Sequence, residues 1–287
     1  MRKEALEFPK SILIETSNKC QGLCKFCPYS KIRKNDGLEL MDEKVFYYLI
    51  DEISKHRPKR ITLFNNNEPL LDKRIFKFIE YVYENNKDTE ITLSTNGIIL
   101  TKEILNKLHD SHLTTLYVSI PTIDEEKYEY LMGVKPFKLF KLLESIDDNS
   151  MKKMIRIAVP ETKYYDKESM KAKFGDYLIC SWPLEYKGSW QMKEEFEKFS
   201  LNMQYAGPCD RPLDQAVISS NGDVIICCRD WSRENVVGNI NYDSLYNIWK
   251  SDKMKKIQNE IINNNYNKIK CCSTCSLNYK YYKEKIK

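Results

Sequence analysis

Histidine and long apolar stretches are scarce in this chain of 287 residues. Its three histidines, His56, His109 and His112, lie on or beside predicted helices, so we assign them no catalytic role. No apolar run approaches the roughly 18 residues of a membrane-spanning helix, and the mean hydropathy is -0.57. The first residues also lack the apolar core of a secretion signal. We therefore expect a cytoplasmic protein with no membrane partner.

A large excess of one charge sign is missing as well. The chain has 46 lysines and arginines against 41 aspartates and glutamates, which leaves a net charge of +5. The lysines are scattered among acidic residues, and the run at 280–287 has the composition of a solvated tail. This pattern is typical of an ordinary protein surface and argues against a nucleic-acid partner.

Cysteine, by contrast, is abundant, with ten residues. In a chain without a secretion signal, this number indicates thiolate chemistry in a reducing compartment rather than disulfides. Cys20, Cys24 and Cys27 lie within eight residues of one another. Three thiolates leave one iron of a four-iron cluster open, which suggests an exogenous ligand at that iron. Zinc is the weaker alternative, because a structural zinc site needs a fourth protein ligand and the nearest histidine is His56.

A second set of four cysteines lies in the last third of the chain: Cys209, Cys227, Cys272 and Cys275. Asn221-Gly222 stands between two apolar stretches, which predicts a hairpin that brings the second cysteine back toward the first. Ser244 is then expected to cap one long amphipathic helix that returns the chain to the last pair. Four thiolates also suit tetrahedral zinc, so a zinc ribbon remains the alternative for this set. Cys228 and Cys271 adjoin two of the four, and either could replace its neighbour as a ligand.

Strand-like and helix-like stretches alternate from about residue 11 to 180. We expect strands at 11–16, 60–64, 90–94, 115–120, 154–159 and 177–180. Between them, Asp42, Asp72 and Thr101 are placed to cap helices. The helix after Asp72 would direct four apolar residues inward: Ile75, Phe76, Ile79 and Val82. Strands that alternate with helices predict βαβ units, a parallel sheet and an α/β fold.

The spacing of the first three cysteines, CxxxCxxC, resembles that of the radical S-adenosylmethionine (radical SAM) superfamily. Phe26 stands where that family usually has an aromatic residue. The resemblance extends over about residues 10–275. It implies that Cys20, Cys24 and Cys27 are catalytic and hold a 4Fe–4S cluster, whose open iron chelates the amino and carboxylate groups of SAM. Electron transfer into the sulfonium, from a flavodoxin- or ferredoxin-type donor, would then release a 5′-deoxyadenosyl radical.

The second cysteine set also resembles a family pattern. Twelve residues separate Cys209 from Gly222, and four separate Gly222 from Cys227, which is similar to the opening of the SPASM domain. The resemblance implies the shortened form, called a twitch domain, with one auxiliary 4Fe–4S cluster held by Cys209, Cys227, Cys272 and Cys275. It also implies a partial (β/α)6 radical SAM barrel over residues 1–190 and a small β-hairpin–helix domain over residues 191–287.

Further segments fall where the family places contacts to SAM. Asn67-Glu68-Pro69 is similar to a Gly-Glu-Pro motif that holds the amino group of SAM, although Asn65–Asn67 replaces the usual glycines. Ser119 stands where the family often has Ser-Ile-Asp, here with Pro121 in place of the aspartate. Arg156 could reach a carboxylate from the barrel mouth, with an outward salt bridge as the alternative. The resemblance implies nine cofactor-binding residues: Phe26, Asn67, Glu68, Pro69, Ser94, Thr95, Asn96, Ser119 and Arg156.

The segment from Cys180 to Trp190 leaves the last predicted strand on the side where family members bind substrate. Its candidate substrate contacts are Trp182, Glu185, Tyr186 and Lys187, with a buried aromatic seam as the alternative. For Cys180 we favour an inert core cysteine over a participant in the reaction.

The resemblance favours oxidation of a substrate, because a fully ligated auxiliary cluster has no open iron and suits electron transfer. Members of this subfamily include an aminocyclitol dehydrogenase and maturases of ribosomal peptides or proteins. Many maturases carry an N-terminal leader-binding module, and this chain reaches its first cysteines by residue 20. We therefore expect a small carbohydrate- or aminocyclitol-like substrate. The alternatives are a peptide maturase and, from another class, a non-catalytic iron–sulfur or zinc scaffold.

Overall fold

A nine-stranded sheet forms the centre of the protein. The computed structural model describes residues 4–32, 36–183, 209–273 and 275. Within this part of the chain, the strand order is β6-β5-β4-β3-β2-β1-β7-β8-β9. The strands are β1 (Ser11–Ile14), β2 (Arg60–Thr62), β3 (Glu90–Thr95), β4 (Thr115–Ser119), β5 (Ile155–Glu161), β6 (Leu178–Pro183), β7 (Gln215–Ile218), β8 (Asp223–Ile225) and β9 (Val236–Asn239). Strands β1 to β6 pair in parallel in chain order, which confirms the predicted α/β fold and is consistent with a partial barrel.

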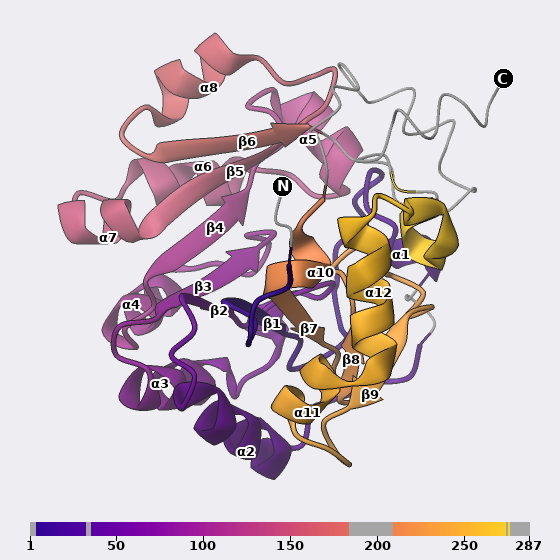
Figure 1. Ribbon diagram of the computed structural model, residues 1–287. Helices are drawn as coiled ribbons and strands as arrows, with labels where there is room; N and C mark the ends of the chain where they lie inside the picture. The colour runs from indigo at the N-terminus through magenta and orange to yellow at the C-terminus, as the bar shows by residue number, and fades with distance from the viewer. Residues whose placement is uncertain (1–3, 33–35, 184–208, 274, 276–287) are drawn as a thin grey trace, which may run out of the picture.

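Helices cover the outer side of this sheet. Figure 1 shows α2, α3 and α4 along one side of the strands, and α11 packs against β9. The helices are α1 (Tyr29–Ile32), α2 (Glu43–Ser54), α3 (Ile75–Asn85), α4 (Lys102–Asp110), α5 (Glu125–Met132), α6 (Phe137–Glu144), α7 (Asn149–Met154), α8 (Lys167–Phe174), α10 (Arg211–Asp214), α11 (Leu245–Lys250), α12 (Asp252–Ile262) and α13 (Lys270–Ser273), with 3₁₀ turns η1 (Pro69–Leu71) and η3 (Tyr266–Lys268). None of them combines the length and hydrophobicity that crossing a lipid bilayer requires.

Three of the predicted helix caps are confirmed. The carboxylate of Asp42 accepts backbone N–H groups at the start of α2, and the Thr101 and Ser244 hydroxyls do so at the starts of α4 and α11. Each satisfies a donor that the first helical turn leaves without a partner. Asp72 has a different role, because α3 begins later and its cap residue is Arg74. The Asp72 carboxylate instead accepts the backbone N–H and the guanidinium of Arg74.

The inward face of α3 differs from the predicted one by one residue. Phe78 is fully buried and stacks on Phe46 of α2, with ring centroids 4.0 Å apart, whereas Phe76 is only half-buried. Because α3 begins at Ile75, positions three, four and seven residues later share its face, and these include Phe78. Phe76 packs against the core only in part, and Phe78, which was not predicted, takes the fully buried place on this face.

The predicted long helix after Ser244 is in fact two helices. Ser251 takes an extended conformation, with φ -63 and ψ 154, and ends α11. Its hydroxyl then accepts the N–H of Met254 at 3.2 Å and so caps α12. The break lets α11 pack against both β9 and α2.

The C-terminal hairpin continues the sheet of the first six strands. Strand β7 pairs in parallel with β1, in the register Ile12↔Ala216. The predicted hairpin joins β7 to β8 in antiparallel pairing, and Gly222 in its turn has φ 88. β9 extends it by a strand that the sequence did not reveal. The proposed domain boundary at residue 190 lies outside the described residues.

The packing of α3 gives a stability prediction. Phe78→Ala should lower the free energy of unfolding by about 3–5 kcal/mol, because it opens a cavity against Phe46. Phe76→Ala, the matched control on the same helix, should cost less than about 2 kcal/mol. Urea unfolding followed by circular dichroism measures both. Equal losses would contradict the assigned helix face.

Candidate active site at the strand ends

A cavity of about 260 Å³ lies at the carboxyl ends of the parallel strands. Loops at this edge carry the chemistry in barrel folds of this kind. The lining residues come from the first cysteine loop, from later segments up to position 160 and, in one case, from the C-terminal region: Cys20, Cys24, Phe26, Cys27, Pro28, Tyr29, Phe64, Asn65, Asn66, Asn67, Glu68, Ser94, Thr95, Asn96, Ser119, Met132, Pro160 and Trp231. All the predicted SAM contacts except Pro69 and Arg156 are among them.

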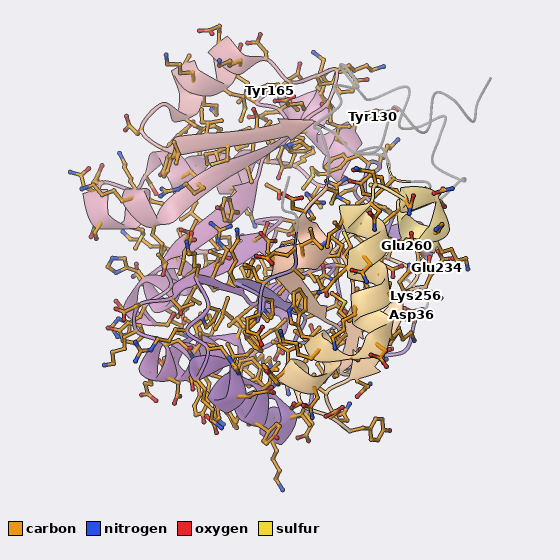
Figure 2. The ribbon with its side chains drawn as sticks, in the orientation of Figure 1. Asp36, Tyr130, Tyr165, Glu234, Lys256 and Glu260 are labelled. Carbon is orange, nitrogen blue, oxygen red and sulfur yellow. The ribbon has the colours of Figure 1, made fainter. Side chains whose placement is uncertain are left out.

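Hydrogen bonds and one side-chain contact hold the first cysteine loop in place after the end of β1. The N–H of Cys20 donates to the Tyr29 hydroxyl at 2.9 Å, and this hydroxyl donates to the Asn18 carbonyl at 3.0 Å. The N–H of Lys25 donates to the Leu131 carbonyl of α5 at 2.8 Å. The Lys25 ammonium also lies 3.8 Å above the ring of Tyr130, which is labelled in Figure 2. The loop is therefore fastened to α5 by both its backbone and a side chain.

The sulfur atoms of this loop converge on a small space beside Gly22. A Cβ atom at position 22 would lie 3.3 Å from the Cys20 sulfur and 3.4 Å from the Cys24 sulfur. The amide of Asn96 donates to the Cys20 sulfur at 3.7 Å and thereby ties the loop to the end of β3. A side chain larger than that of glycine would crowd the space where two thiolates can share a metal cluster.

Burial makes these thiols hard to ionise in the protein alone. Desolvation raises the pKa of Cys20 to about 11, and the nearby Glu68 and Cys27 add to the shift. Desolvation raises the pKa of Cys24 even more than that of Cys20. The nearby thiols of Cys27 and Cys20 add to this shift. Metal ions supply the positive charge that deprotonates coordinating thiols. The three cysteines therefore fit an iron–sulfur cluster as donor set and in their electrostatics.

Glu68 presents a buried carboxyl group to the same cavity. Its oxygens accept the Thr95 hydroxyl at 2.7 Å, the Asn96 N–H at 2.8 Å and the Leu70 N–H at 3.3 Å. Burial nevertheless raises the pKa of Glu68 to about 7, above its model-compound value of 4.5. A cationic ligand such as an ammonium group would favour the ionised form. Pro69 begins η1 behind this residue and is buried away from the cavity.

Two asparagines beside Glu68 carry polar atoms that lack partners among the described residues. They are the Oδ1 atom of Asn65 and the Nδ2 atom of Asn67. Both side chains are more than nine-tenths buried and line the cavity, with exposed fractions of 7% and 6%. Buried polar atoms nearly always have a hydrogen-bond partner. Both residues line the cavity, but these two atoms are themselves shielded from solvent, so a polar ligand such as the amino-acid end of SAM would reach them only after a small shift of the two side chains.

Arg156 lies away from the cavity. It stands near the start of β5 and donates to the Lys153 carbonyl at 2.6 Å, whereas Pro160 near the end of β5 lines the cavity. A parallel strand brings only its carboxyl end to the site. The structure thus gives no support to Arg156 as a SAM contact, and within the described part of the chain it shows a backbone contact rather than an outward salt bridge.

The predicted substrate segment falls mostly outside the described residues. This holds for Glu185, Tyr186 and Lys187. The backbone of Trp182 belongs to β6 and pairs with Pro160 at the cavity wall. Cys180 lies two residues earlier in β6. It pairs with Ala158 and is not among the lining residues.

The cysteines of the second set lie close to one another, away from the turn of the β7–β8 hairpin. The pKa of Cys209 is raised to about 11 by burial, and Cys272 and Cys275 lie near enough to contribute. The sulfur of Cys227 accepts the Arg229 N–H at 3.4 Å, and Cys227 and Cys272 are both buried. Cys228 directly follows Cys227, and Cys271 directly precedes Cys272. The sulfurs of Cys271 and Cys272 lie 3.9 Å apart. Which member of each doublet binds metal stays a prediction.

Two arginines that no motif pointed to flank this set. The guanidinium of Arg211 lies beside the Cys227 sulfur, and that of Arg229 lies beside Cys275. Burial lowers the pKa of Arg229 to about 10 despite this thiol. Both cations would face the negative charge of cysteine-ligated iron. The sequence patterns also did not point to Trp231, which lines the cavity at the strand ends. It stands in an irregular loop without a recognisable pattern.

Two family models match the chain at the two cysteine sets. The model of the radical SAM superfamily matches residues 14–164, more than half of the chain. The model of SPASM, an iron–sulfur cluster-binding domain, matches residues 209–276.

Similar proteins and structures include dehydrogenases, cyclases and peptide-binding enzymes. The S-adenosyl-L-methionine-dependent 2-deoxy-scyllo-inosamine dehydrogenase of Niallia circulans is 22% identical over 270 residues, with 92% of each chain covered. The GTP 3',8-cyclase of Aliarcobacter butzleri is 29% identical over 142 residues, but the match spans only 48% of this chain and 42% of the cyclase.

Two solved structures share the fold. One is BtrN in complex with AdoMet and 2-DOIA, with a TM-score of 0.69, 19% identity and 93% of each chain covered. The other is Streptococcus suis SuiB bound to the precursor peptide SuiA, with a TM-score of 0.68, 18% identity, and 88% of this chain and 67% of SuiB covered.

The raised pKa of Glu68 predicts a pH-dependent stability of the cluster-free protein. The folded chain keeps this proton up to about pH 7, whereas the unfolded chain releases it near 4.5, so stability falls as the pH rises through this window. Glu68→Gln removes this effect. Relative to the wild type, the variant should gain up to about 3 kcal/mol between pH 4.5 and 7, as measured by urea unfolding. Glu126→Gln, at an exposed position of α5, is the control; curves for Glu68→Gln that run parallel to the wild type would refute the assignment.

Proposed function

The chain belongs to the radical SAM superfamily and carries a SPASM iron–sulfur cluster-binding domain, and from this premise we propose that it is an oxidoreductase acting on a small carbohydrate- or aminocyclitol-like substrate. Its cofactors are 4Fe–4S clusters and SAM. The observation that carries the proposal is the convergence on one cavity at the strand ends of three cysteines, Glu68 and two asparagines, each with one polar atom that lacks a partner among the described residues.

Each group at the cavity has a distinct part in holding the cofactors. Cys20, Cys24 and Cys27 would ligate the cluster, and Glu68 would accept hydrogen bonds from the ammonium group of SAM. Asn65 and Asn67 would complete the contacts to its amino-acid end. When bound, the cluster and SAM supply the radical chemistry that removes a hydrogen atom from the substrate. The protein orients these groups and keeps water out of the cavity.

The second cysteine set supports oxidation as the net reaction. A substrate oxidised by two electrons gives up the first with its hydrogen atom and must pass on the second. A site ligated by Cys209, Cys227, Cys272 and Cys275 offers the substrate no ligand position, but it can accept that electron. Arg211 and Arg229 would favour the more negative, reduced state there. A flavodoxin- or ferredoxin-type protein would supply the electron for SAM cleavage.

The likeness to the Niallia circulans dehydrogenase favours a small ring alcohol as substrate, because the match spans 92% of both chains. A maturase of a ribosomal peptide or protein is the second candidate. The observation in its favour is the fold shared with SuiB in its complex with a precursor peptide. The two candidates differ in the substrate that stimulates SAM consumption.

The first experiment tests for two clusters and for SAM cleavage. After anaerobic reconstitution, the wild type should hold about eight irons per chain and form 5′-deoxyadenosine with dithionite and SAM. The triple variant Cys20→Ala, Cys24→Ala, Cys27→Ala should keep about four irons and lose SAM cleavage. Replacing the four cysteines of the second set should leave about four irons and retain it. If the protein instead holds zinc and leaves SAM uncleaved, the result would contradict the enzyme proposal and favour a metal-binding scaffold.

Substrate class is tested by the deoxyadenosine that a candidate elicits. 2-Deoxy-scyllo-inosamine and related aminocyclitols should raise its rate of formation at least several-fold and yield one ketone for each deoxyadenosine. Mass spectrometry quantifies both products. The variant that lacks the second cysteine set should still form deoxyadenosine but little ketone. Stimulation by peptides alone would favour the maturase instead.

A further inference from the structure

Trp231 brings the C-terminal part of the chain into the cavity. Every other lining residue lies between positions 20 and 160, whereas Trp231 follows Cys227 of the second set by four residues. The indole is 8% exposed and belongs to the wall that also contains Cys20 and Glu68. The loop after Cys227 therefore contributes one side chain to the wall of the proposed SAM site.

The loop that carries Trp231 is tightly held by its own backbone. Asp230 is 2% exposed, and its carboxylate accepts the N–H groups of Glu234 at 2.9 Å and Asn235 at 2.8 Å. Arg233 completes the turn in a left-handed conformation with φ 52. Glu234, labelled in Figure 2, pairs with Lys270 of α13 at 2.7 Å. The loop thus has a defined shape from which the indole projects.

A partly buried ion pair connects this loop to the strands of the barrel. The guanidinium of Arg233 donates to Glu39 at 2.8 Å and to Glu15 at 3.4 Å. Glu15 is fully buried just after β1, and its second oxygen accepts the N–H of Asn66 at 3.1 Å. A single carboxylate therefore contacts both the Trp231 loop and the asparagine loop of the cavity. The Ser220 hydroxyl at the hairpin lies within hydrogen-bond distance of the same two carboxylates, 2.8 Å from Glu39 and 3.3 Å from Glu15.

We propose that Trp231 packs against bound SAM as a wall of its site contributed by the C-terminal region, and that Arg233 is a positioning residue that sets this wall through Glu15. The inference rests on the proposed function, because SAM is the occupant. Aromatic side chains combine a large contact area with few rotatable bonds, so a fixed indole adds affinity at low entropic cost. Loss of the indole should weaken SAM binding without loss of either cluster.

The test measures the dissociation constant of SAM by equilibrium dialysis on the reconstituted holoprotein, without reductant, so that SAM is bound but not cleaved. Trp231→Ala should raise it about tenfold, and Trp231→Phe should raise it less. Tyr242→Ala, an aromatic truncation at an 89% exposed position of the same region, should leave it unchanged. Iron content and circular dichroism establish that each variant is folded and loaded.

Arg233 is tested through its dependence on Trp231. Arg233→Gln should raise the dissociation constant in the wild-type background but not in the Trp231→Ala background, and Arg233→Lys should restore most of the affinity. Additive effects would assign Arg233 to the Asn66 loop and overturn its proposed role. Unchanged SAM binding by Trp231→Ala would overturn the wall itself. A wild type that binds no SAM would overturn this inference together with the proposed function.

Discussion

The parallel pairing of β1 with both β2 and β7 is the constraint on which the rest of the structure depends. Strand β1 leads into the first cysteine loop, β2 leads into the Asn65–Glu68 loop, and β7 leads into the turn at 219–222, from which antiparallel β8 runs back toward Cys227. Because parallel strands end at the same edge of a sheet, these three loops meet although up to about 200 residues separate them. The two cysteine sets are thus parts of one sheet rather than of two loosely connected units.

Desolvation is the main electrostatic effect at that edge. It raises the pKa of Cys20 to about 11 and that of Glu68 to about 7, and it leaves Asn65 and Asn67 with polar atoms that have no partner among the described residues. Each of these groups is unfavourable to bury alone and becomes favourable when a metal cluster or a polar cation binds. The apolar core beneath the sheet offsets this cost in the cofactor-free protein. The same residues therefore lower stability and provide the binding site.

The ion pair of Arg233 with Glu15 and Glu39 also serves the site more than the stability of the fold. A buried ion pair adds little net stability, because desolvation of its charges opposes their attraction. Its directional hydrogen bonds, however, fix one orientation of the groups that it joins. Here it connects the loop after Cys227 with the loop that carries Asn66, which agrees with a role in geometry rather than in stability.

The sequence by itself determined the cysteine sets, most helix caps and the Asn221-Gly222 hairpin, because spacing and turn chemistry are local properties, and its resemblance to the radical SAM superfamily pointed to the segments that meet at the cavity. The tertiary structure decided what depends on register and strand direction. The start of α3 selected Phe78 over Phe76, and an extended Ser251 divided one predicted helix into two. The direction of β5 removed Arg156 from the site, and the β1–β7 pairing brought Trp231 into it. No local pattern encodes the contact of Trp231 with the cavity, since it arises between segments that are distant in the chain.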